Sequence, residues 1–222
     1  MENNLEISVK RTKDGSTTLF LPSIKETYHS SHGAIQEAKH VFIKNGLCEI
    51  KNTEISILEV GFGTGLNALL SSSYASENNT TIHYTGLETV PLPLEVINEL
   101  NYLEQEPALS KEDFKLLHES SWEEKNAIHP YFYLTKVNQK VQEYSNSQKF
   151  DVIFYDAFGP RAQKEMWNKE IFQNLYSQLE EGGRLVTYCA MGQFKRDLKA
   201  VGFEVKNVQG PPGKREMTIG VK

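Results

Sequence analysis

Apolar and polar positions alternate along the chain in blocks that predict a repeated strand–helix order. Continuous apolar runs, expected to be strands, are "EISILEVGFG", "TIHYTGLE", "YFYLTKV", "FDVIFYDAF" and "GGRLVTYCA". Helices are expected over "GAIQEAKHVFIKNGL", over residues 65–75, 93–104, 111–119 and 164–179, and over "GQFKRDLKAVG". Such an alternation, with strands that are apolar throughout, predicts an α/β fold in which helices cover both faces of a mainly parallel sheet.

The two ends of the chain break this alternation. "LEISVKRTKDGSTTLFL" predicts two strands around the Asp14–Gly15 turn, so we expect a small β-hairpin extension over residues 1–32 and the main domain over 33–222. The closing strands "FEVKNVQ" and "EMTIGVK" are joined only by "GPPGKR", which is too short for a helical crossover. The last strand should therefore be antiparallel. A seven-stranded Rossmann-like sheet of this kind resembles that of class I S-adenosylmethionine-dependent methyltransferases, although a fold alone does not give a function.

Composition and charge exclude several classes of protein. At 222 residues with 39% hydrophobic residues, the chain fits one good-sized domain, and no run of about 18 apolar residues suggests a membrane span. The start "MENNLEISVKRTKDG" is unlike a signal peptide, and Cys48 and Cys189 are too far apart for a metal or redox motif. We therefore expect a cytoplasmic protein with reduced thiols.

The net charge of -5 counts against a general nucleic-acid binder, but the charge is uneven along the chain. From Arg184 to Lys222, eight basic residues face three acidic ones, a local excess of +5. Such a face is most often only solvated surface. It becomes relevant if the substrate is a polyanion.

A glycine-rich loop follows the first strand of the main domain. In "LEVGFGTGLNALL", Gly61, Gly63 and Gly65 allow a sharp turn and a close approach of backbone to ligand, while Leu66 stands where a dinucleotide fingerprint requires its third glycine. With Glu59, the order E-x-G-x-G-x-G resembles motif I of class I methyltransferases, where the loop surrounds the amino-acid and ribose parts of S-adenosylmethionine. A purely structural glycine turn is the alternative.

Two further acids end later strands. Glu88 lies about 25 residues beyond the loop, the spacing at which a βαβ unit places an acid against ribose hydroxyls. Asp156 ends "FDVIFYD", at the strand edge that faces the crevice of open α/β sheets, where a carboxylate could orient an amine and accept its proton. The alternatives are an exposed strand-end glutamate and an aspartate that only caps its loop.

Four segments together resemble one family: "VGFGTGLNALL", "YTGLETVPL", "FDVIFYDAFGPRAQKEMW" and "GKREMTIG" are similar to the tRNA 5-methylaminomethyl-2-thiouridine methyltransferases, the methyltransferase half of MnmC-type proteins. The resemblance implies N-methylation, by S-adenosylmethionine, of the 5-aminomethyl group of (2-thio)uridine at the tRNA wobble position. It also implies that Glu59 and the three glycines hold the donor, Glu88 its ribose, and Asp156 the substrate amine. The positions matched around the substrate end are Phe158, Pro160, Trp167, Lys214, Arg215 and Met217.

The sequence departs from the family pattern D-A-F-[AS]-P-x-x-N-P-x-[ML]-W at Gly159 and at Gln163-Lys164, so the substrate approach is expected to differ in detail. Bifunctional members continue into a flavin-dependent oxidase domain, whereas this sequence ends at Lys222. Its aminomethyl group is therefore expected to come from another enzyme. The anticodon base could stack on Tyr28, Phe158 or Trp167, and "YHSSHG" is expected at the substrate mouth.

Some assignments stay open at this point. His29 and His32 have no third ligand near them in sequence, so no metal site is expected. Asn138 or its neighbours are candidates for the adenine contact, without a motif to rank them. Two other functions remain: a spermidine-synthase-like aminopropyltransferase, which shares the glycine loop, the ribose acid and the strand-end aspartate, and a non-catalytic nucleotide-binding module.

Overall fold

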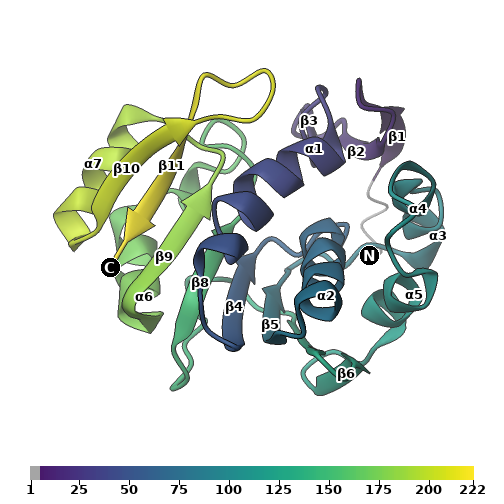
Figure 1. The fold of residues 1–222 in the computed structure, drawn as a ribbon. Coiled ribbons are helices and arrows are strands. Elements are labelled where there is room, and N and C mark those ends of the chain that lie inside the picture. The colour runs from purple at the N-terminus through teal and green to yellow at the C-terminus, as the bar shows by residue number, and fades with distance from the viewer. Residues whose placement is uncertain (1–5) are drawn as a thin grey trace.

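Five parallel strands form the middle of the sheet in the computed structural model, which describes residues 6–222. They are β4 (Glu54–Val60), β5 (Thr81–Leu87), β7 (Phe132–Val137), β8 (Phe150–Tyr155) and β9 (Leu179–Thr187). At one end β11 (Glu216–Val221) lies between β9 and β10 (Glu204–Gln209) and runs antiparallel to both. The predicted class I methyltransferase sheet with an antiparallel last strand is confirmed (Figure 1).

An eighth strand at the other edge was not predicted. β6 (Lys125–His129) pairs antiparallel with β7, with a register shift between Ala127 and His129. Only Ile128 of "KNAIH" is buried, so the segment has neither the apolar run nor the alternation that marks a strand in sequence. The complete order is β10-β11-β9-β8-β4-β5-β7-β6.

Helices cover the two faces of this sheet and close two hydrophobic cores (Figure 1). One core lies under α1 (Ala34–Ala38), α2 (Leu66–Asn78) and α5 (Lys111–Glu119), and the other under α6 (Lys169–Gln178) and α7 (Gly192–Val201). α1 continues as a π-helical turn over Lys39–Lys44, followed by a short 3-10 turn at Leu47–Glu49. Side chains cap two helices: the Ser110 hydroxyl accepts the Asp113 N–H, and the Asn168 side chain accepts the Ile171 N–H.

Two predicted helices are broken in the structure. The one expected over 93–104 is two short helices, α3 (Leu94–Ile97) and α4 (Tyr102–Gln105), because Asn101 is non-helical and its side chain and N–H bond to Gly15 and Thr17 of the N-terminal hairpin. The one expected over 164–179 begins as a 3-10 turn at Lys164–Met166, and α6 starts only at Lys169. In the second case the Asn168 side chain caps the start of α6, so the regular helix begins after it.

The N-terminal part is a three-stranded antiparallel sheet rather than a simple hairpin. β1 (Ser8–Arg11) pairs with β2 (Thr17–Leu21) around the predicted turn, where Gly15 has a φ of 89°, and β2 pairs with β3 (Glu26–Thr27). Residues 1–5 of the predicted extension, including Leu5 at the start of its expected first strand, lie outside the described residues. The domain boundary at residues 32 and 33 stays a prediction.

The N-terminal sheet is attached to the main domain through polar contacts, one set buried and one exposed. The buried His29 ring bonds to Thr18 on β2, 3.2 Å away, and its other nitrogen lies 3.5 Å from the Thr64 hydroxyl of the glycine loop. The Asp14 carboxylate accepts the Gln36 N–H of α1 at 3.1 Å. The small sheet therefore stands beside the carboxyl ends of the parallel strands. No helix within residues 6–222 is long and apolar enough to cross a membrane.

Candidate functional site

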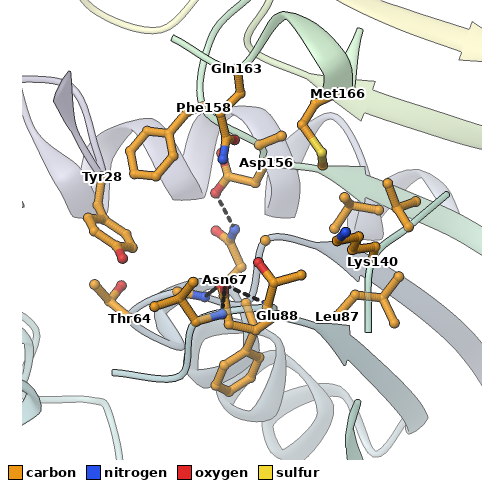
Figure 2. A pocket seen from close by; sticks show the side chains of 18 of the residues that line it. Tyr28, Thr64, Asn67, Leu87, Glu88, Lys140, Asp156, Phe158, Gln163 and Met166 are labelled. Atoms are coloured by element: carbon orange, nitrogen blue, oxygen red, sulfur yellow. Dashed lines mark hydrogen bonds between the residues drawn. The ribbon is translucent and has the colours of Figure 1, made fainter. Parts of the chain in front are cut away.

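A cavity of about 340 Å³ opens at the carboxyl ends of β4, β5 and β8. It lies between the glycine loop, the loops that follow β5, β7 and β8, and the N-terminal sheet. Figure 2 shows Tyr28 and Phe158 at one end, Leu87, Lys140 and Met166 at the other, and Asn67 and Glu88 between them with Asp156 opposite Glu88. The volume falls in the range of small-molecule and cofactor sites.

The glycine loop is enclosed on two sides. Gly61, Gly63 and Gly65 have φ values of 93°, 48° and 70°, the left-handed region that favours glycine. A Cβ at Gly61 would lie 2.7 Å from the Asp156 carbonyl oxygen, and one at Gly63 would lie 3.0 Å from the Tyr28 ring. Gly61 and Gly63 line the cavity, whereas Gly65 lies beneath it and precedes α2.

Glu88 joins the end of β5 to this loop. Its Oε2 accepts the Gly63 N–H at 3.0 Å, and its Oε1 accepts the Thr89 and Val90 N–H groups at 2.8 and 2.9 Å. Burial raises the pKa of this carboxyl, while the three N–H donors favour its ionised form. A carboxylate has about four acceptor positions, so it can also accept from a hydroxyl group in the cavity.

An apolar slot occupies the end of the cavity beyond Glu88. It is formed by Leu87 at the end of β5, Val90 after that strand, Val141 in the β7–β8 loop, and Met166. Gln139, Lys140 and Gln142 of the β7–β8 loop also line the cavity, whereas the candidate Asn138 does not. The backbone N–H of Asn138 donates to Glu123 Oε1 at 2.7 Å. The cavity thus joins an apolar slot to a carboxylate and a glycine loop, a lining that suits a ligand with a flat apolar ring and hydroxyl groups.

Asp156 lies at the cavity wall directly after β8. Its N–H donates to the Val60 carbonyl at 3.0 Å, and its Oδ2 accepts from Asn67 Nδ2 at 2.9 Å. Burial, followed by the charge of Glu37, raises the pKa of Asp156 to about 7, while the Asn67 hydrogen bond and the charge of Lys214 lower it. A carboxyl group that titrates near neutral pH can accept a proton and release it again.

Glu59 does not line the cavity. It is 1% exposed, and its Oε1 accepts from Asn67 Nδ2 at 2.8 Å. Burial, and then the charge of Asp156, raise the pKa of Glu59 well above its ordinary value. Glu59 was expected to hold the donor together with the glycines. In the structure it lies behind the glycine loop and is connected to the cavity through Asn67. Asn67 was missed in the sequence, where the one signal is a polar residue inside the apolar run "LNALL".

The opposite end of the cavity is aromatic. The Tyr28 and Phe158 rings meet edge to face, with centroids 5.1 Å apart, and Tyr28, His29 and Tyr188 also line the wall. The expectation that "YHSSHG" lies at the mouth agrees with this placement of Tyr28 and His29. Trp167 instead packs between Tyr155 and Phe194, 8% exposed. Its Nε1 donates to the Phe158 carbonyl at 2.8 Å, so it supports Phe158 rather than lining the cavity.

The remaining residues matched to the substrate end surround the cavity without lining it. Lys214 Nζ donates to Glu37 at 2.6 Å and lies 3.8 Å from the centre of the Tyr188 ring. Met217 is fully buried in the core, Arg215 is exposed, and Pro160 lies in the loop after Phe158. Of the six predicted substrate residues, Phe158 alone lines the cavity in the described part of the chain.

Two relatives similar to this chain carry the name tRNA 5-methylaminomethyl-2-thiouridine biosynthesis bifunctional protein MnmC. The protein from Leptospira interrogans is 32% identical over 211 residues, which cover 88% of this chain and 32% of the relative. The protein from Cupriavidus necator is 28% identical over 214 residues, covering 90% of this chain and 32% of the relative. The chain thus spans about a third of the length of the curated relatives it matches.

A solved structure, MnmC2 from Aquifex aeolicus, matches the fold with a TM-score of 0.76 at 23% identity, covering 99% of this chain and 71% of that one. The family model described as S-adenosyl-L-methionine-dependent methyltransferase matches residues 111–222. This match covers half of the chain and includes Asp156, the β7–β8 loop and the antiparallel β11. The chain therefore belongs to the S-adenosyl-L-methionine-dependent methyltransferase family.

Proposed function

We propose that the enzyme transfers the methyl group of S-adenosylmethionine to the 5-aminomethyl nitrogen of (2-thio)uridine at the tRNA wobble position, giving 5-methylaminomethyl-(2-thio)uridine. The observation that carries the proposal is the Asp156 carboxyl in the cavity wall, between the donor loop and an aromatic end, with a pKa of about 7. The names of the relatives support the choice of tRNA as substrate.

Asp156 has the properties that N-methylation of an amine requires. Bound S-adenosylmethionine supplies an electrophilic methyl carbon, and only an unprotonated amine has the lone pair to attack it. The substrate amine is mostly protonated at neutral pH, so a neighbouring carboxylate must orient its N–H bonds and accept one proton. Asp156 does this when ionised, and its pKa near 7 lets it release the proton after transfer.

The donor and the acceptor would occupy opposite ends of the cavity. We assign Gly61, Gly63 and Glu88 to direct donor contact, with Gly65 and Glu59 supporting the loop from beneath. We assign Tyr28 and Phe158 to the base, because unstacked RNA bases are commonly bound on aromatic side chains. Trp167 then holds this end through its bond to the Phe158 carbonyl, and Lys214 through its contact with the Tyr188 ring. Pro160, Arg215 and Met217 are assigned to the surroundings of the substrate end by the resemblance alone.

The proposal defines the partners of the enzyme. The polyanionic partner is the anticodon region of tRNA, and we assign the aminomethyl group to an upstream enzyme, because the uridine must carry this group before its nitrogen can be methylated. We place the reaction in the cytoplasm, with the tRNA.

The deciding experiment is methyl transfer to tRNA from cells that lack the activity, followed by mass analysis of the nucleosides. A gain of one methyl group on the aminomethyl-uridine, dependent on S-adenosylmethionine, is expected. Decarboxylated S-adenosylmethionine with putrescine is the parallel arm for the aminopropyltransferase alternative. If the donor binds tightly and no tRNA nucleoside gains a methyl group, the proposal is wrong.

A further inference from the structure

One amide nitrogen is shared between two carboxyl groups at the base of the cavity. Asn67 Nδ2 donates to Glu59 Oε1 at 2.8 Å and to Asp156 Oδ2 at 2.9 Å, the second bond being visible in Figure 2. Asn67 is 2% exposed and Glu59 is 1% exposed. The amide turns Nδ2 toward both carboxyl groups, because Oδ1 facing an ionised Asp156 would place acceptor against acceptor. In this orientation Oδ1 is buried and has no hydrogen-bond partner among the described residues.

Three elements meet at this amide. Asn67 lies in the first turn of α2, two positions after the left-handed Gly65, and its carbonyl accepts the Ser71 hydroxyl at 2.7 Å. Glu59 lies near the end of β4, and Asp156 follows the neighbouring parallel strand β8, where Glu59 pairs with Phe154. The position of the Asp156 side chain is thus tied to the donor loop through a single side chain.

We propose that Asn67 is a positioning residue: it fixes the Asp156 carboxyl so that Oδ1 is left to accept from the acceptor amine, and a neutral Glu59 fixes Asn67 in turn. The inference rests on the proposed function in naming the amine, but the Glu59–Asn67–Asp156 network is independent of the substrate. Asn67 touches neither reacting atom in this scheme and acts only through Asp156.

Burial and charge favour a neutral Glu59. Its Oε2 is buried and has no hydrogen-bond partner of good geometry among the described residues. Burial, together with the charges of Asp156 and Glu88, raises the pKa of Glu59, while Asn67 and the nearby Tyr84 hydroxyl act in the opposite direction and are outweighed. Two ionised carboxylates bridged by one amide would repel each other in a site that excludes water. A neutral Glu59 leaves Asp156 as the charge that an ammonium group can meet, with Glu37 and Lys214 acting on it from α1 and from the β10–β11 loop.

Removing the amide has a predictable consequence for Asp156. The Asn67 hydrogen bond favours the ionised carboxylate, so its loss raises the pKa of Asp156 further above 7. In Asn67→Ala, the acid limb of the pH profile of kcat/KM is expected to move to higher pH. We expect kcat to fall about 10- to 100-fold, because Asp156 is also no longer held in place. The Kd for S-adenosylmethionine should change by less than about threefold, because Asn67 acts through Asp156 and the change in binding free energy is therefore small.

The matched control is Asn78→Ala at the other end of α2. Asn78 is exposed and donates only to the Tyr74 carbonyl, so this variant should keep the wild-type profile. Glu59→Gln is expected to rescue most of the activity lost in Glu59→Ala, because a neutral amide can also accept the Asn67 N–H. Equal losses in the two Glu59 variants would contradict a neutral Glu59.

A substrate-free readout separates this inference from the proposed function. In the wild-type protein, the side-chain N–H signals of Asn67 in NMR spectra should shift with pH at the midpoint of the Asp156 carboxyl titration, assigned with Asp156→Asn. In Asn67→Ala the Asp156 midpoint should rise. If the Asn67 signals do not follow Asp156, or if the midpoint is unchanged in Asn67→Ala, the inference is overturned, whatever the substrate proves to be.

Discussion

At the residue scale, the two glycines that line the cavity have different neighbours. Gly61 leaves room for the Asp156 carbonyl, which is backbone, whereas Gly63 leaves room for the Tyr28 ring, which belongs to the N-terminal part of the chain. Gly61 therefore sets the distance between the glycine loop and Asp156 at the end of β8. Gly63 sets the distance between the glycine loop and the aromatic end of the cavity.

Gly63→Ala is expected to weaken S-adenosylmethionine binding at least about tenfold, a change of about 1.4 kcal/mol. The new Cβ would lie 3.0 Å from Tyr28, and a φ of 48° is strained for alanine. Calorimetric titration with the donor measures the effect. Gly182→Ala is the matched control, because Gly182 also has a positive φ, 78°, but nothing within 4 Å of its Cβ position. An equal loss of binding in both variants would contradict the steric explanation.

The effect of Asp156→Asn on folding stability should depend on pH. The folded-state pKa of Asp156, about 7, lies above its ordinary value, so the wild-type protein loses this contribution to folding stability as the pH rises through 7. The variant has no such loss. Its Tm relative to wild type should therefore be higher at pH 8.5 than at pH 5, as measured by thermal unfolding. A Tm difference that is the same at both pH values would show that burial does not raise this pKa.

The same variant should lose about 10²- to 10⁴-fold in methyl transfer, the range for removal of a general base. In the wild type, kcat/KM is expected to fall below about pH 7 as Asp156 becomes protonated. Retention of transfer by Asp156→Asn would assign the residue to loop structure alone.

At the element scale, the strands with continuous apolar runs could be predicted from sequence, and the contacts between distant segments could not. The five central strands and β11 follow from local pattern and from the short "GPPGKR" link. The break between α3 and α4 depends on Asn101 meeting residues more than 80 positions earlier, which no local pattern records. β6 is mostly exposed, so its sequence lacks the alternation of apolar and polar residues that predicts a strand.

The same distinction holds for the candidate site. Glu88, Asp156 and the glycines were predictable because strand ends and loop spacing place them. That Glu59 lies behind the glycine loop while Asn67 lines the cavity could not be predicted from sequence, because the packing of the folded chain decides which side chain faces the cavity. Lys214 is a third case: its sequence context suggested substrate contact, and in the structure it is paired with Glu37.

The Glu37–Lys214 pair joins α1 to the β10–β11 loop and gives opposite predictions for its two members. Lys214 lowers the pKa of Asp156 and Glu37 raises it. Lys214→Met should therefore move the Asp156 titration to higher pH, and Glu37→Gln should move it to lower pH. Both variants break the same ion pair, so a merely structural effect would move the titration in one direction only. Carboxyl NMR titration distinguishes the two outcomes.

At the scale of the whole molecule, the basic C-terminal part carries fewer free charges than its sequence suggests. Lys195 pairs with Glu216 at 2.7 Å, Lys206 with Glu204 at 3.3 Å, and Lys222 with Glu181 at 3.4 Å. The acids of the first two pairs are already counted in the local excess of +5, whereas Lys222–Glu181 and Lys214–Glu37 use acids outside this part of the chain and therefore reduce that excess. Because the whole chain has a net charge of -5, tRNA binding should depend on a small number of cations near the cavity.

Arg215 is the cation in this part of the chain that we expect to contact a phosphate. It is exposed, and it follows Lys214, whose amine lies over the cavity-lining Tyr188. Arg215→Ala should weaken tRNA binding and reduce the slope of log K against log salt by about one. Lys206→Ala is the matched control, since Lys206 is also in the basic part but is paired with Glu204. Filter binding at several salt concentrations measures both slopes.

Because phosphate contacts carry no base information, the ratio of affinities for modified and unmodified tRNA should stay constant in Arg215→Ala. A change in that ratio would instead place Arg215 at the wobble base.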